Sequence, residues 1–266
     1  MKKEHMSNVN KTLYIPLYGK AYVSKKGLFL HDPKAEEIWA KEGFTLGRKA
    51  KSKWLAYYMG IRAAVFDHWL RQQMTQAPDA VIIHLGCGMD SRVLRVGTAG
   101  HPWYDIDFPE VIEERKRYYS ETQDYHMMMG DARNSKWLSN IPENKRAIVV
   151  MEGVSMYVTE EELRTLMEAL CAHFQQIALL MDAYTVLAAK MSKYKNPIRE
   201  VGVTQVYGMD DPTVLVHNAL TYLGEKEMIP ARYIDELRGT EKKIFRTLYA
   251  GKLSHKLYKL FEYQKM

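Results

Sequence analysis

The sequence predicts an α/β fold built on a doubly wound, mostly parallel sheet. Residues 80–85 (AVIIHL) are apolar almost throughout, which is typical of a strand covered on both faces rather than on one. After this segment, strand-like runs alternate with helix-like segments over short connections. Repeating strand and helix elements of this kind indicate a parallel, doubly wound sheet.

The chain before this strand, residues 1–75, is expected to be a helical region. Over residues 45–73, large apolar side chains recur at spacings of about three and four, which is the period of a helix with one buried face. The side chains on this face are Trp54, Leu55, Tyr58, Ile61, Val65 and Trp69. We therefore expect a long helix that packs against an apolar surface.

Four more strands are expected within residues 76–183, which would form the cofactor-binding core. The first of them ends in Asp105-Ile106-Asp107. The others are residues 125–129 (YHMMM), 147–151 (AIVVM) and 177–181 (IALLM).

Two helices between these strands carry clear start signals. Pro109 stands at a first-turn position and predicts a helix that runs to about Ser120. Thr159 and Glu162 form a T-x-x-E capping box, in which two side chains satisfy backbone N–H groups at a helix start. The apolar face that follows consists of Leu163, Leu166, Met167, Leu170 and Phe174.

The alternation of strands and helices loosens after the fifth strand. Residues 184–224 are a candidate substrate lid, because their Lys-, Gly- and Pro-containing first part fits an excursion over the ligand edge better than a core element. Within this range, an amphipathic helix is expected over 213–223. Residues 225–266 are expected to complete the sheet, with 255–263 (HKLYKLFEY) as a terminal strand. The whole chain, 1–266, is expected to form a single domain.

The first strand runs directly into a glycine loop, Gly86-Cys87-Gly88. Glycine at these two places lets the backbone turn sharply and approach a ligand closely, since a Cβ would collide with the ligand or the turn. Asp107 follows Gly86 by 21 positions, close to the offset of about 20 at which an acidic side chain reaches ribose hydroxyls in such folds. These residues predict a ligand that contains ribose.

The residues after the second glycine distinguish between two ribose-containing cofactors. A dinucleotide fingerprint has the pattern G-x-G-x-x-G/A, whereas this chain has Asp90 in the loop and Ser91 at the last place. A carboxylate beside a pyrophosphate would repel it. The same carboxylate is acceptable near S-adenosylmethionine (SAM), which carries a sulfonium cation and no phosphate. SAM is therefore favoured over NAD.

Several separate segments of the chain share their order with a known family. They are residues 16–22 (PLYGKAY), 31–33 (HDP), Arg62, 85–92 (LGCGMDSR), 105–111 (DIDFPEV) with Lys116, 130–133 (GDAR) and 151–157 (MEGVSMY). In these segments, which span about residues 13–170, the chain resembles the leucine carboxyl methyltransferase-like SAM-dependent methyltransferases. That family includes bacterial polyketide O-methyltransferases. The DFP and EGVxMY elements are the specific ones, whereas the glycine loop alone is not.

The resemblance implies a class I, Rossmann-like SAM-dependent methyltransferase with N-terminal helices and a lid insertion. Its cofactor would be S-adenosylmethionine, which becomes S-adenosylhomocysteine (SAH), and it would use no metal. The expected reaction is methyl transfer to a carboxylate or hydroxyl of a small, polyketide-like molecule, with a protein C-terminal carboxyl group as an alternative acceptor. Two alternatives belong to other classes. One is a non-catalytic SAM-binding protein, and the other is an NAD-dependent oxidoreductase, which Asp90 and Ser91 disfavour.

Most of the predicted site residues bind the cofactor. Asp107 is expected to accept hydrogen bonds from the ribose hydroxyls, and Asp131 to meet the adenine amino group together with the backbone of Ala132. By the resemblance, Arg62 clamps the cofactor carboxylate, for which a bidentate guanidinium is suited. Lys20 resembles a second partner of that carboxylate.

The remaining predicted residues surround the loop and the reacting end of the cofactor. Glu152 ends the fourth strand, at the edge where ligands bind, and resembles the family's acid near the methionine moiety. Tyr157 is expected to line the methyl-transfer cleft as a catalytic residue, with a packed aromatic as the alternative. The predicted cofactor site is completed by Gly86, Cys87, Gly88, Asp90 and Phe108.

One residue near the loop departs from the pattern. His84 stands two places before the first glycine, where many SAM enzymes carry an acid or an amide. A polar contact that is usual at that place is therefore expected to be altered.

Composition and charge limit the classes of partner. The net charge of +6, from 38 Lys and Arg against 32 Asp and Glu, is spread over scattered lysines without a nucleic-acid-binding motif, so we expect no nucleic acid partner. The basic excess favours an anionic substrate, and a phenolic one is the alternative. Cys87 and Cys171 lack the spacing of a disulfide framework or a zinc site. The first residues have a basic start but lack the apolar core of a signal peptide, and no run approaches the length needed to span a membrane, so the cytoplasm is the expected location.

Overall fold

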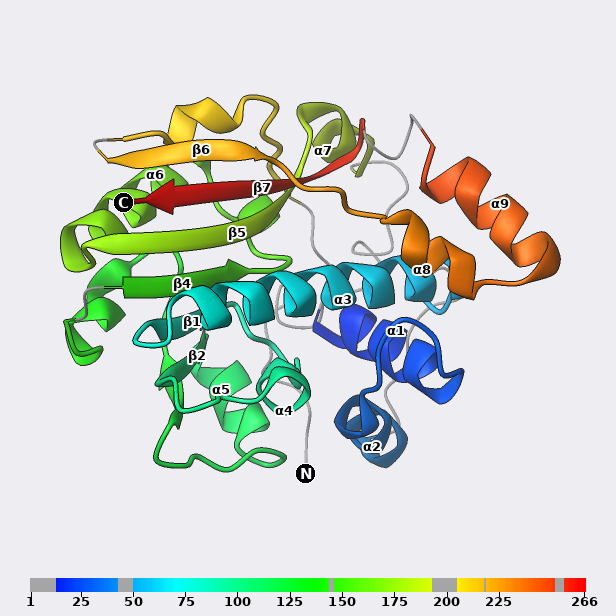
Figure 1. Cartoon of the computed structure of the whole chain (residues 1–266), viewed down its shortest axis with the longest axis horizontal. Helices are drawn as coiled ribbons and strands as arrows, with labels where there is room; N and C mark the ends of the chain where they lie inside the picture. The colour runs from blue at the N-terminus through cyan, green and yellow to red at the C-terminus, as the bar shows by residue number, and fades with distance from the viewer. Residues whose placement is uncertain (1–12, 43–49, 144–145, 193–204, 218, 252–255) are drawn as a thin grey trace.

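The computed structural model describes residues 13–42, 50–143, 146–192, 205–217, 219–251 and 256–266. Among these residues, seven strands form one sheet in the order β3-β2-β1-β4-β5-β7-β6 (Figure 1). The strands are β1 (Val81–Leu85), β2 (Trp103–Asp107), β3 (Tyr125–Met129), β4 (Arg146–Met151), β5 (Gln176–Tyr184), β6 (Leu220–Glu225) and β7 (Tyr258–Lys265). The first five are parallel, and β7 is antiparallel to both of its neighbours.

Helices cover the faces of the sheet and gather at one end of it, and α3 crosses the front of the view in Figure 1. The α-helices are α1 (Tyr14–Lys25), α2 (Pro33–Glu42), α3 (Lys53–Gln76), α4 (Arg92–Val96), α5 (Pro109–Arg115), α6 (Glu160–His173), α7 (Val186–Ser192), α8 (Ala231–Glu236) and α9 (Gly239–Tyr249). Short 3-10 segments are η2 (Ser135–Asn140), η3 (Ser155–Tyr157) and η5 (Pro212–Leu215). No helix in the described part of the chain is long and apolar enough to cross a membrane.

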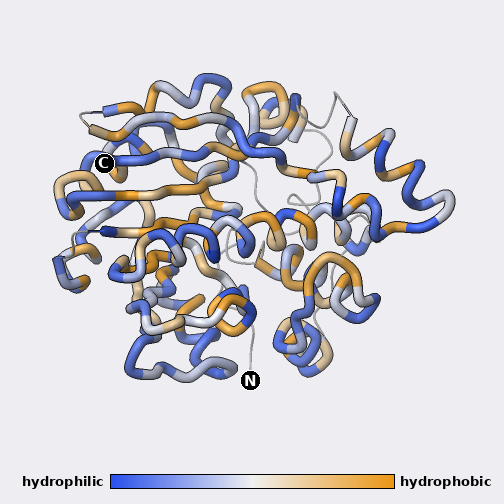
Figure 2. Tube along the Cα trace, viewed as in Figure 1, coloured by the Kyte–Doolittle hydropathy of each residue, from blue (hydrophilic) through white to orange (hydrophobic). Residues whose placement is uncertain are grey.

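The central strands are buried on both faces, which explains their unbroken apolar sequences. In β1, Ile82 belongs to one cluster of buried side chains, and its neighbours Val81 and Ile83 belong to the other. In β4, Val149 and Val150 divide between the two clusters in the same way. Because successive side chains of a strand point to opposite faces, such a sheet needs apolar residues at every position. Figure 2 shows the hydrophobic colouring along β4 and β5. The predicted doubly wound fold is confirmed.

Most predicted elements are confirmed, with shifted ends. The first five strands fall where they were expected, although β5 continues to Tyr184. The long N-terminal helix is α3, and residues 43–49 of its predicted range lie outside the described residues. The capping box at the start of α6 is formed as predicted. The Thr159 hydroxyl accepts from the Glu162 N–H over 3.2 Å, and the Glu162 carboxylate accepts from the Thr159 N–H over 2.8 Å.

The helix that begins at Pro109 ends at Arg115, earlier than the predicted end near Ser120. Arg115 turns its side chain into the core, where it pairs with the buried carboxylate of Asp105 on β2. The backbone N–H groups of Tyr118 and Tyr119 then both donate to the Arg115 carbonyl, in a turn that buries the two rings. This buried ion pair explains why the regular helix stops.

The predicted amphipathic helix over 213–223 is wrong. The chain instead forms η5, in which the Asp211 side chain accepts from the Thr213 N–H over 2.8 Å, and then strand β6. Strand β6 pairs with β7, and its side chains alternate between buried and more exposed positions. The deciding factor is the open edge of β7, which lies far along the chain and supplies backbone hydrogen bonds that a helix would not use.

The expected terminal strand is confirmed as β7, which lies inside the sheet between β5 and β6. The range predicted as a lid, 184–224, divides into parts. It includes α7, whereas residues 193–204 lie outside the described residues and residues 220–224 belong to β6. A lid therefore stays a proposal only for the residues before β6.

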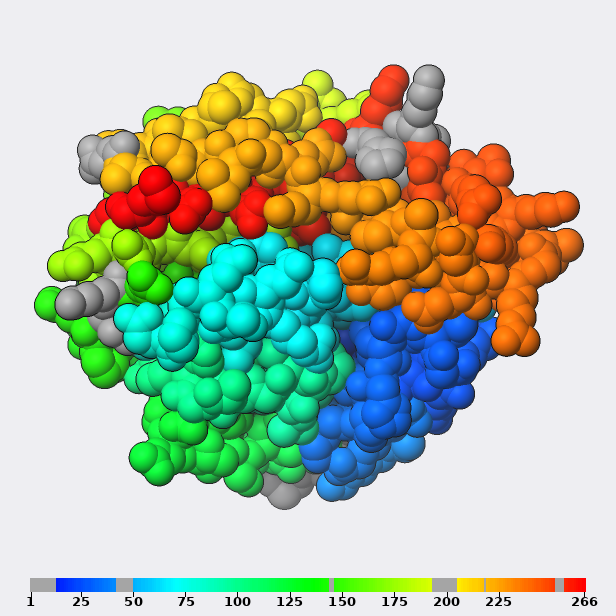
Figure 3. Space-filling model, viewed as in Figure 1, coloured from blue at the N-terminus to red at the C-terminus, as the bar shows by residue number. Residues whose placement is uncertain are grey.

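The last two helices brace the N-terminal helices against the rest of the molecule. The Phe29 N–H donates to Glu236 of α8 over 2.6 Å, and the Tyr57 hydroxyl of α3 donates to Glu241 of α9 over 2.8 Å. The Tyr57 ring also meets the ring of Phe245 edge-on, with centroids 6.0 Å apart. Figure 3 shows α8 and α9, in orange, beside the blue N-terminal helices. These contacts join α8 and α9 to α3 and to the segment that follows α1.

Candidate active site

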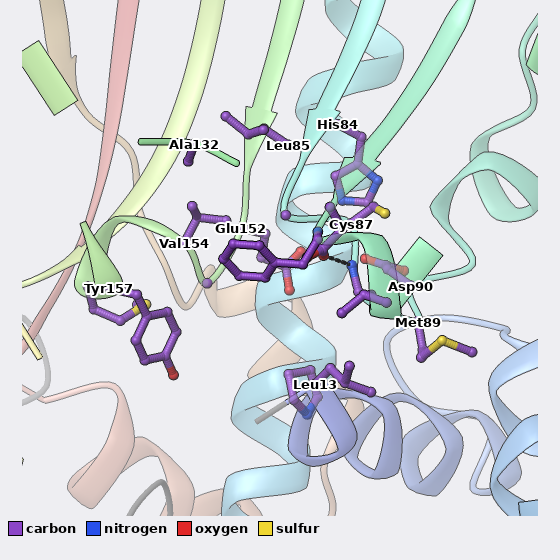
Figure 4. Close-up of a pocket in the computed structure, with 18 of the residues that line it drawn as sticks. Leu13, His84, Leu85, Cys87, Met89, Asp90, Ala132, Glu152, Val154 and Tyr157 are labelled. Carbon is purple, nitrogen blue, oxygen red and sulfur yellow. Dashed lines mark hydrogen bonds between the residues drawn. The ribbon is translucent and has the colours of Figure 1, made fainter. Parts of the chain in front are cut away.

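A cavity of about 630 Å³ lies at the carboxyl ends of β1, β2 and β4 (Figure 4). The strand order reverses at this point, because β2 lies on one side of β1 and β4 on the other. Open α/β sheets bind ligands at such a switch point, and cavities of about 300–1,000 Å³ hold small molecules. We call this space the central cavity.

Every residue predicted for the site lines the central cavity. These residues are Lys20, Arg62, Gly86, Cys87, Gly88, Asp90, Asp107, Phe108, Asp131, Ala132, Glu152 and Tyr157. They come from α1, from α3 and from the segments at the carboxyl ends of the first four strands. Residues from the N-terminal helices and residues from the strand ends thus meet around the central cavity.

The loop after β1 requires glycine for two reasons. Gly86 and Gly88 have φ of 67° and 51°, in the left-handed region that other residues rarely adopt. A Cβ on Gly86 would also lie 2.2 Å from Cγ2 of Val154, in the segment after β4. The loop therefore packs tightly against that segment, and the cavity opens over its backbone.

Asp107 ties the end of β2 to this loop. Its Oδ2 accepts a hydrogen bond from the Gly88 N–H over 2.7 Å, and its Oδ1 accepts from the Phe108 N–H over 2.8 Å. Each oxygen has a further lone pair for a ligand hydroxyl. Burial raises the pKa of the Asp107 carboxyl to about 6, although both N–H groups favour its ionised form. The side chain is thus oriented by backbone contacts before any ligand binds.

Asp90 lies at the centre of a group of buried charges beneath the loop. Its carboxylate is 3.0 Å from Nζ of Lys20, 2.7 Å from Nη1 of Arg95 and 3.4 Å from Nη1 of Arg92. Burial opposes ionisation, but these three cations hold the pKa of Asp90 well below its usual range. Lys20 therefore already pairs with Asp90 at the cavity wall, whether or not a ligand is bound.

Arg62 holds two further acids, one of which, Glu152, also pairs with Arg92 of the Asp90 group. Its Nε donates to Glu152 over 3.0 Å, and its Nη1 donates to Asp182 over 3.0 Å and to the Tyr258 hydroxyl over 2.7 Å. Its Nη2 faces the backbone of Gly153, where a Cβ would lie 3.6 Å away. Burial raises the pKa of the Glu152 carboxyl, but the cations of Arg62 and Arg92 outweigh this effect and hold the pKa at about 2.

The far end of the cavity is formed by the segments after β2 and β3. Asp131 pairs with Arg133 over 2.6 Å, and the Arg133 guanidinium lies over the Phe108 ring at 5.6 Å. Ala132 lines the cavity beside them. A carboxylate, a small residue and an aromatic ring therefore line this end of the cavity.

The side of the cavity away from β1 is mostly apolar. Figure 4 shows Tyr157 on this side, at a distance from His84, whereas Leu13 lies against the loop, where its Cβ is 3.5 Å from the Cβ position of Gly88. Leu55 and Met59 of α3 and Tyr184 at the end of β5 also line it. The central cavity therefore joins a polar half to an apolar, partly aromatic half.

Several charged residues of the site, and one tyrosine, were missed from the sequence. They are Asp32, Asp67, Arg92, Arg95, Arg115, Asp182 and Tyr258, all of which take part in the buried contacts around the cavity. Asp182 could have been predicted as a site residue, because it lies near the carboxyl end of a predicted strand, as Glu152 and Asp107 do. Tyr258 could not, because 196 positions separate it from its partner Arg62.

The hydrogen-bond donors and acceptors in the polar half of the cavity match the groups of SAM. The Asp107 carboxylate offers acceptors for a ribose diol, and the three residues of the glycine loop line the cavity beside it. The Arg62 guanidinium is suited to a carboxylate. Among the described residues, no three His, Cys, Asp or Glu side chains form a group that could hold a metal ion.

Comparisons with known proteins agree with this site. The model of the leucine carboxyl methyltransferase family matches residues 8–171, more than half of the chain. The tetracenomycin polyketide synthesis O-methyltransferase TcmP of Streptomyces glaucescens is 27% identical over 259 residues, which cover 95% of this chain and 96% of that protein. The S-adenosyl-L-methionine-dependent methyltransferase dpfgK of Gibberella zeae is 27% identical over 236 residues, or 80% of this chain and 79% of that protein.

A solved structure supports the fold. Magnesium protoporphyrin IX methyltransferase (ChlM) of Synechocystis PCC 6803, with bound SAH, superposes with a TM-score of 0.54 at 12% identity, over 97% of this chain and all of that one. The family match, rather than this likeness in fold, excludes the NAD-dependent oxidoreductase considered above. The chain belongs to the leucine carboxyl methyltransferase family and is a SAM-dependent methyltransferase with the class I, Rossmann-like fold.

Proposed function

We propose that this enzyme transfers a methyl group from SAM to an oxygen, a carboxylate or hydroxyl, of a small polyketide-like molecule. The observation that carries the proposal is the continuity of the central cavity from the glycine loop to the apolar wall of α1, α3 and Tyr157. An apolar, partly aromatic wall suits a flat aromatic acceptor. The similarity to TcmP over almost the full length of both chains supports the same substrate class.

The cofactor roles follow from the contacts of each side chain. Asp107 would accept from the ribose hydroxyls, because both of its oxygens are already oriented toward the cavity by backbone N–H groups. Asp131 and Ala132 would meet the adenine at the far end, beside Phe108. Arg62 would bind the cofactor carboxylate through Nη2, since its other nitrogens hold protein partners.

The loop and its neighbours would support the reacting end of the cofactor. Lys20 would share the cofactor carboxylate with Arg62, and Asp90 and Glu152 would offset the positive charge of the amino and sulfonium groups. Gly86, Cys87 and Gly88 would present the backbone of the loop to the ligand.

Bound SAM supplies a methyl group on a positively charged sulfur, which is a good leaving group. The protein therefore needs mainly to align the acceptor oxygen with that methyl group and to exclude water. Tyr157 and the apolar wall would do both by packing against the acceptor. A carboxylate acceptor is already ionised at neutral pH, whereas a phenol with a pKa of about 10 gains from a nearby base.

The charged side chains of the cavity are largely paired with one another, which favours recognition of the acceptor by its shape rather than by its charge. Among the described lining residues, each basic side chain already has an acidic partner. The pairs are Lys20 with Asp90, Arg62 with Glu152, His84 with Asp105 and Arg133 with Asp131. The positive potential that an anionic acceptor meets is therefore smaller than the net charge suggests. An aromatic acceptor, anionic or phenolic, would be held mainly by ring contacts, to which Tyr184, at the start of the proposed lid, would contribute.

Methyl transfer from tritium-labelled SAM to a panel of aromatic polyketides tests this proposal. The panel contains matched compounds that carry only a carboxyl group or only a hydroxyl group, and Asp107→Asn is the control. Mild alkali releases labelled methanol from a methyl ester but not from a methyl ether, so the product identifies the acceptor oxygen. Label in a peptide with a free C-terminus, and in no polyketide, would instead support the protein carboxyl alternative.

A further inference from the structure

His84 is buried on β1 with both ring nitrogens in hydrogen-bond contact. Its Nδ1 lies 2.9 Å from Oδ1 of Asp105, and its Nε2 lies 3.0 Å from Nη1 of Arg92. A guanidinium can only donate, so Nε2 must accept and Nδ1 must carry the proton that it donates to Asp105. Burial lowers the pKa of His84, so the ring is neutral near pH 7 and Nε2 keeps its lone pair. The ring thus joins an acid on β2 to a cation on α4.

Arg92 continues this chain of contacts toward the cavity. Its Nε donates to Asp67 over 2.8 Å, and its Nη2 donates to Oε2 of Glu152. The other oxygen of Glu152 accepts from Arg62 over 3.0 Å. The four side chains are buried, so little solvent competes for these contacts. A displacement of Arg92 would therefore be passed through Glu152 to Arg62.

The two neighbours of His84 depend on it to different degrees. Asp105 also accepts from Trp103 over 2.9 Å, from Tyr125 over 2.7 Å and from Arg115. Nη1 of Arg92 has besides His84 only the 3.4 Å contact with Asp90 among the described residues. Loss of the imidazole would therefore leave Asp105 in place and release one arm of Arg92.

We propose that His84 is a positioning residue for the amino-acid end of the cofactor, and that it acts through Arg92 and Glu152 on Arg62. It would not touch the reacting atoms. The inference rests on the role proposed above for Arg62. It also explains how this chain accommodates a histidine two places before the first glycine: the ring supplies the acceptor that Arg92 needs.

Two ligands separate this role from general support of the loop. SAH carries the amino-acid carboxylate, whereas 5′-methylthioadenosine has the same adenosine and sulfur without it. Titration calorimetry would give the dissociation constants of both for the parent and for two variants. His84→Asn is long enough for Asp105 but too short for Arg92, and His84→Gln offers an amide that reaches Arg92.

His84→Asn is expected to weaken SAH binding about tenfold, because a misplaced clamp loses its contact with the carboxylate. Its affinity for 5′-methylthioadenosine is expected to stay within about twofold of the parent, and His84→Gln to recover most of the SAH affinity. His101→Leu is the matched control, because His101 is also buried but bonds only to the Ala80 carbonyl, over 2.8 Å, and does not line the cavity. It should lower the melting temperature without changing the ratio of the two affinities.

Each outcome decides one claim. A parent that prefers SAH, combined with a His84→Asn variant that keeps the same preference, would overturn the positioning role alone. A parent that binds both ligands equally would overturn the role of Arg62, and the inference with it. If His84→Asn does not fold, the same comparison is made with His84→Gln and His84→Ser, since only the longer side chain reaches Arg92.

Discussion

Nε of Arg62, on α3, donates a hydrogen bond over 3.0 Å to Oε1 of Glu152, the residue that follows β4. Both side chains are buried, and the same guanidinium holds Asp182 over 3.0 Å. One cation from an N-terminal helix thus compensates two acids at the carboxyl edge of the sheet. The stability of the fold and the polarity of the central cavity depend on the same residue.

Replacing Arg62 should therefore destabilise the protein before any ligand is considered. Arg62→Met is expected to lower the free energy of unfolding by about 3–5 kcal/mol, because among the described residues it leaves buried Asp182 without a cationic partner and leaves Glu152 with Arg92 alone. Urea denaturation at neutral pH would measure the change. Arg133→Met is the control, since Arg133 pairs with Asp131 at a site where its side chain is 47% exposed. A change of about 1 kcal/mol or less is expected there. Equal losses in the two variants would contradict this account.

Gly86→Ala should be costly for two separable reasons. The added Cβ must adopt a φ of 67° and would lie 2.2 Å from Cγ2 of Val154. We expect a loss of about 2–4 kcal/mol in the free energy of unfolding. Gly27→Ala is the control for φ alone, because Gly27 has a φ of 63° and no described atom within 4 Å of its Cβ position. A loss of about 1 kcal/mol in the free energy of unfolding is expected there.

A double-mutant cycle would isolate the steric part of that loss. Adding Val154→Ala to Gly86→Ala removes the methyl group that meets the new Cβ. The double variant should be more stable than the sum of the single changes predicts. Strict additivity would mean that the backbone conformation at Gly86 accounts for the entire effect.

Asp107 should give opposite pH dependences to folding and to ligand binding. Its folded pKa is about 6, above the ordinary value of 3.8, so the folded state binds more protons between these values. Its contribution to the free energy of unfolding is therefore present below about pH 4 and is lost as the pH rises through about 6. SAH binding should tighten over the same rise, because the ionised carboxylate is the stronger acceptor for ribose hydroxyls.

Calorimetric titration of SAH from about pH 5 to about pH 7 would test the binding half of this prediction. Asp107→Asn should bind SAH more weakly and lose the pH dependence, since an amide does not titrate in this range. A parent affinity that is flat over this range would mean that Asp107 is ionised throughout or lies outside the ligand contacts.

Tyr157 should act on the acceptor rather than on the cofactor. Tyr157→Ala is expected to raise the acceptor KM about tenfold, because a ring contact of about 1.4 kcal/mol is lost, while the SAH dissociation constant stays nearly unchanged. Tyr157→Phe keeps the ring and should remain within about twofold of the parent. Steady-state kinetics with the acceptor identified above would show this difference. A larger effect of Tyr157→Phe on kcat than on KM would instead indicate a chemical role for the hydroxyl.

Local patterns were sufficient for most of the sheet and for the location of the site. The apolar run of β1, Gly86 and Gly88 encode a buried strand and a left-handed turn within a few residues of one another, and Asp107 lies at the end of the next strand. Acids at the carboxyl ends of parallel strands necessarily meet at one edge of a sheet. Asp107 and Glu152 therefore line one cavity, together with Lys20 and Arg62, which only the resemblance to the family indicated.

Other features could not be predicted because their causes lie far along the chain. The helix expected over 213–223 is replaced by β6, since β7 offers a free edge that no local pattern announces. Similarly, α5 ends at Arg115 because the guanidinium pairs with Asp105 on β2. In both cases a tertiary partner outweighs the local preference of the segment.

The sequence by itself determined the doubly wound sheet, the glycine loop and the acids at the strand ends, because each depends on spacing within a short segment or on strand ends that a parallel sheet must bring together. Arg62 and Lys20, on the N-terminal helices, were predicted only from the resemblance to the family. Only the tertiary structure decided which charges neutralise one another. Arg62 meets Asp182 and Tyr258 from 120 and 196 positions away, and His84 meets Arg92 across the loop. Buried charges need partners wherever the fold supplies them, and that choice is made in three dimensions.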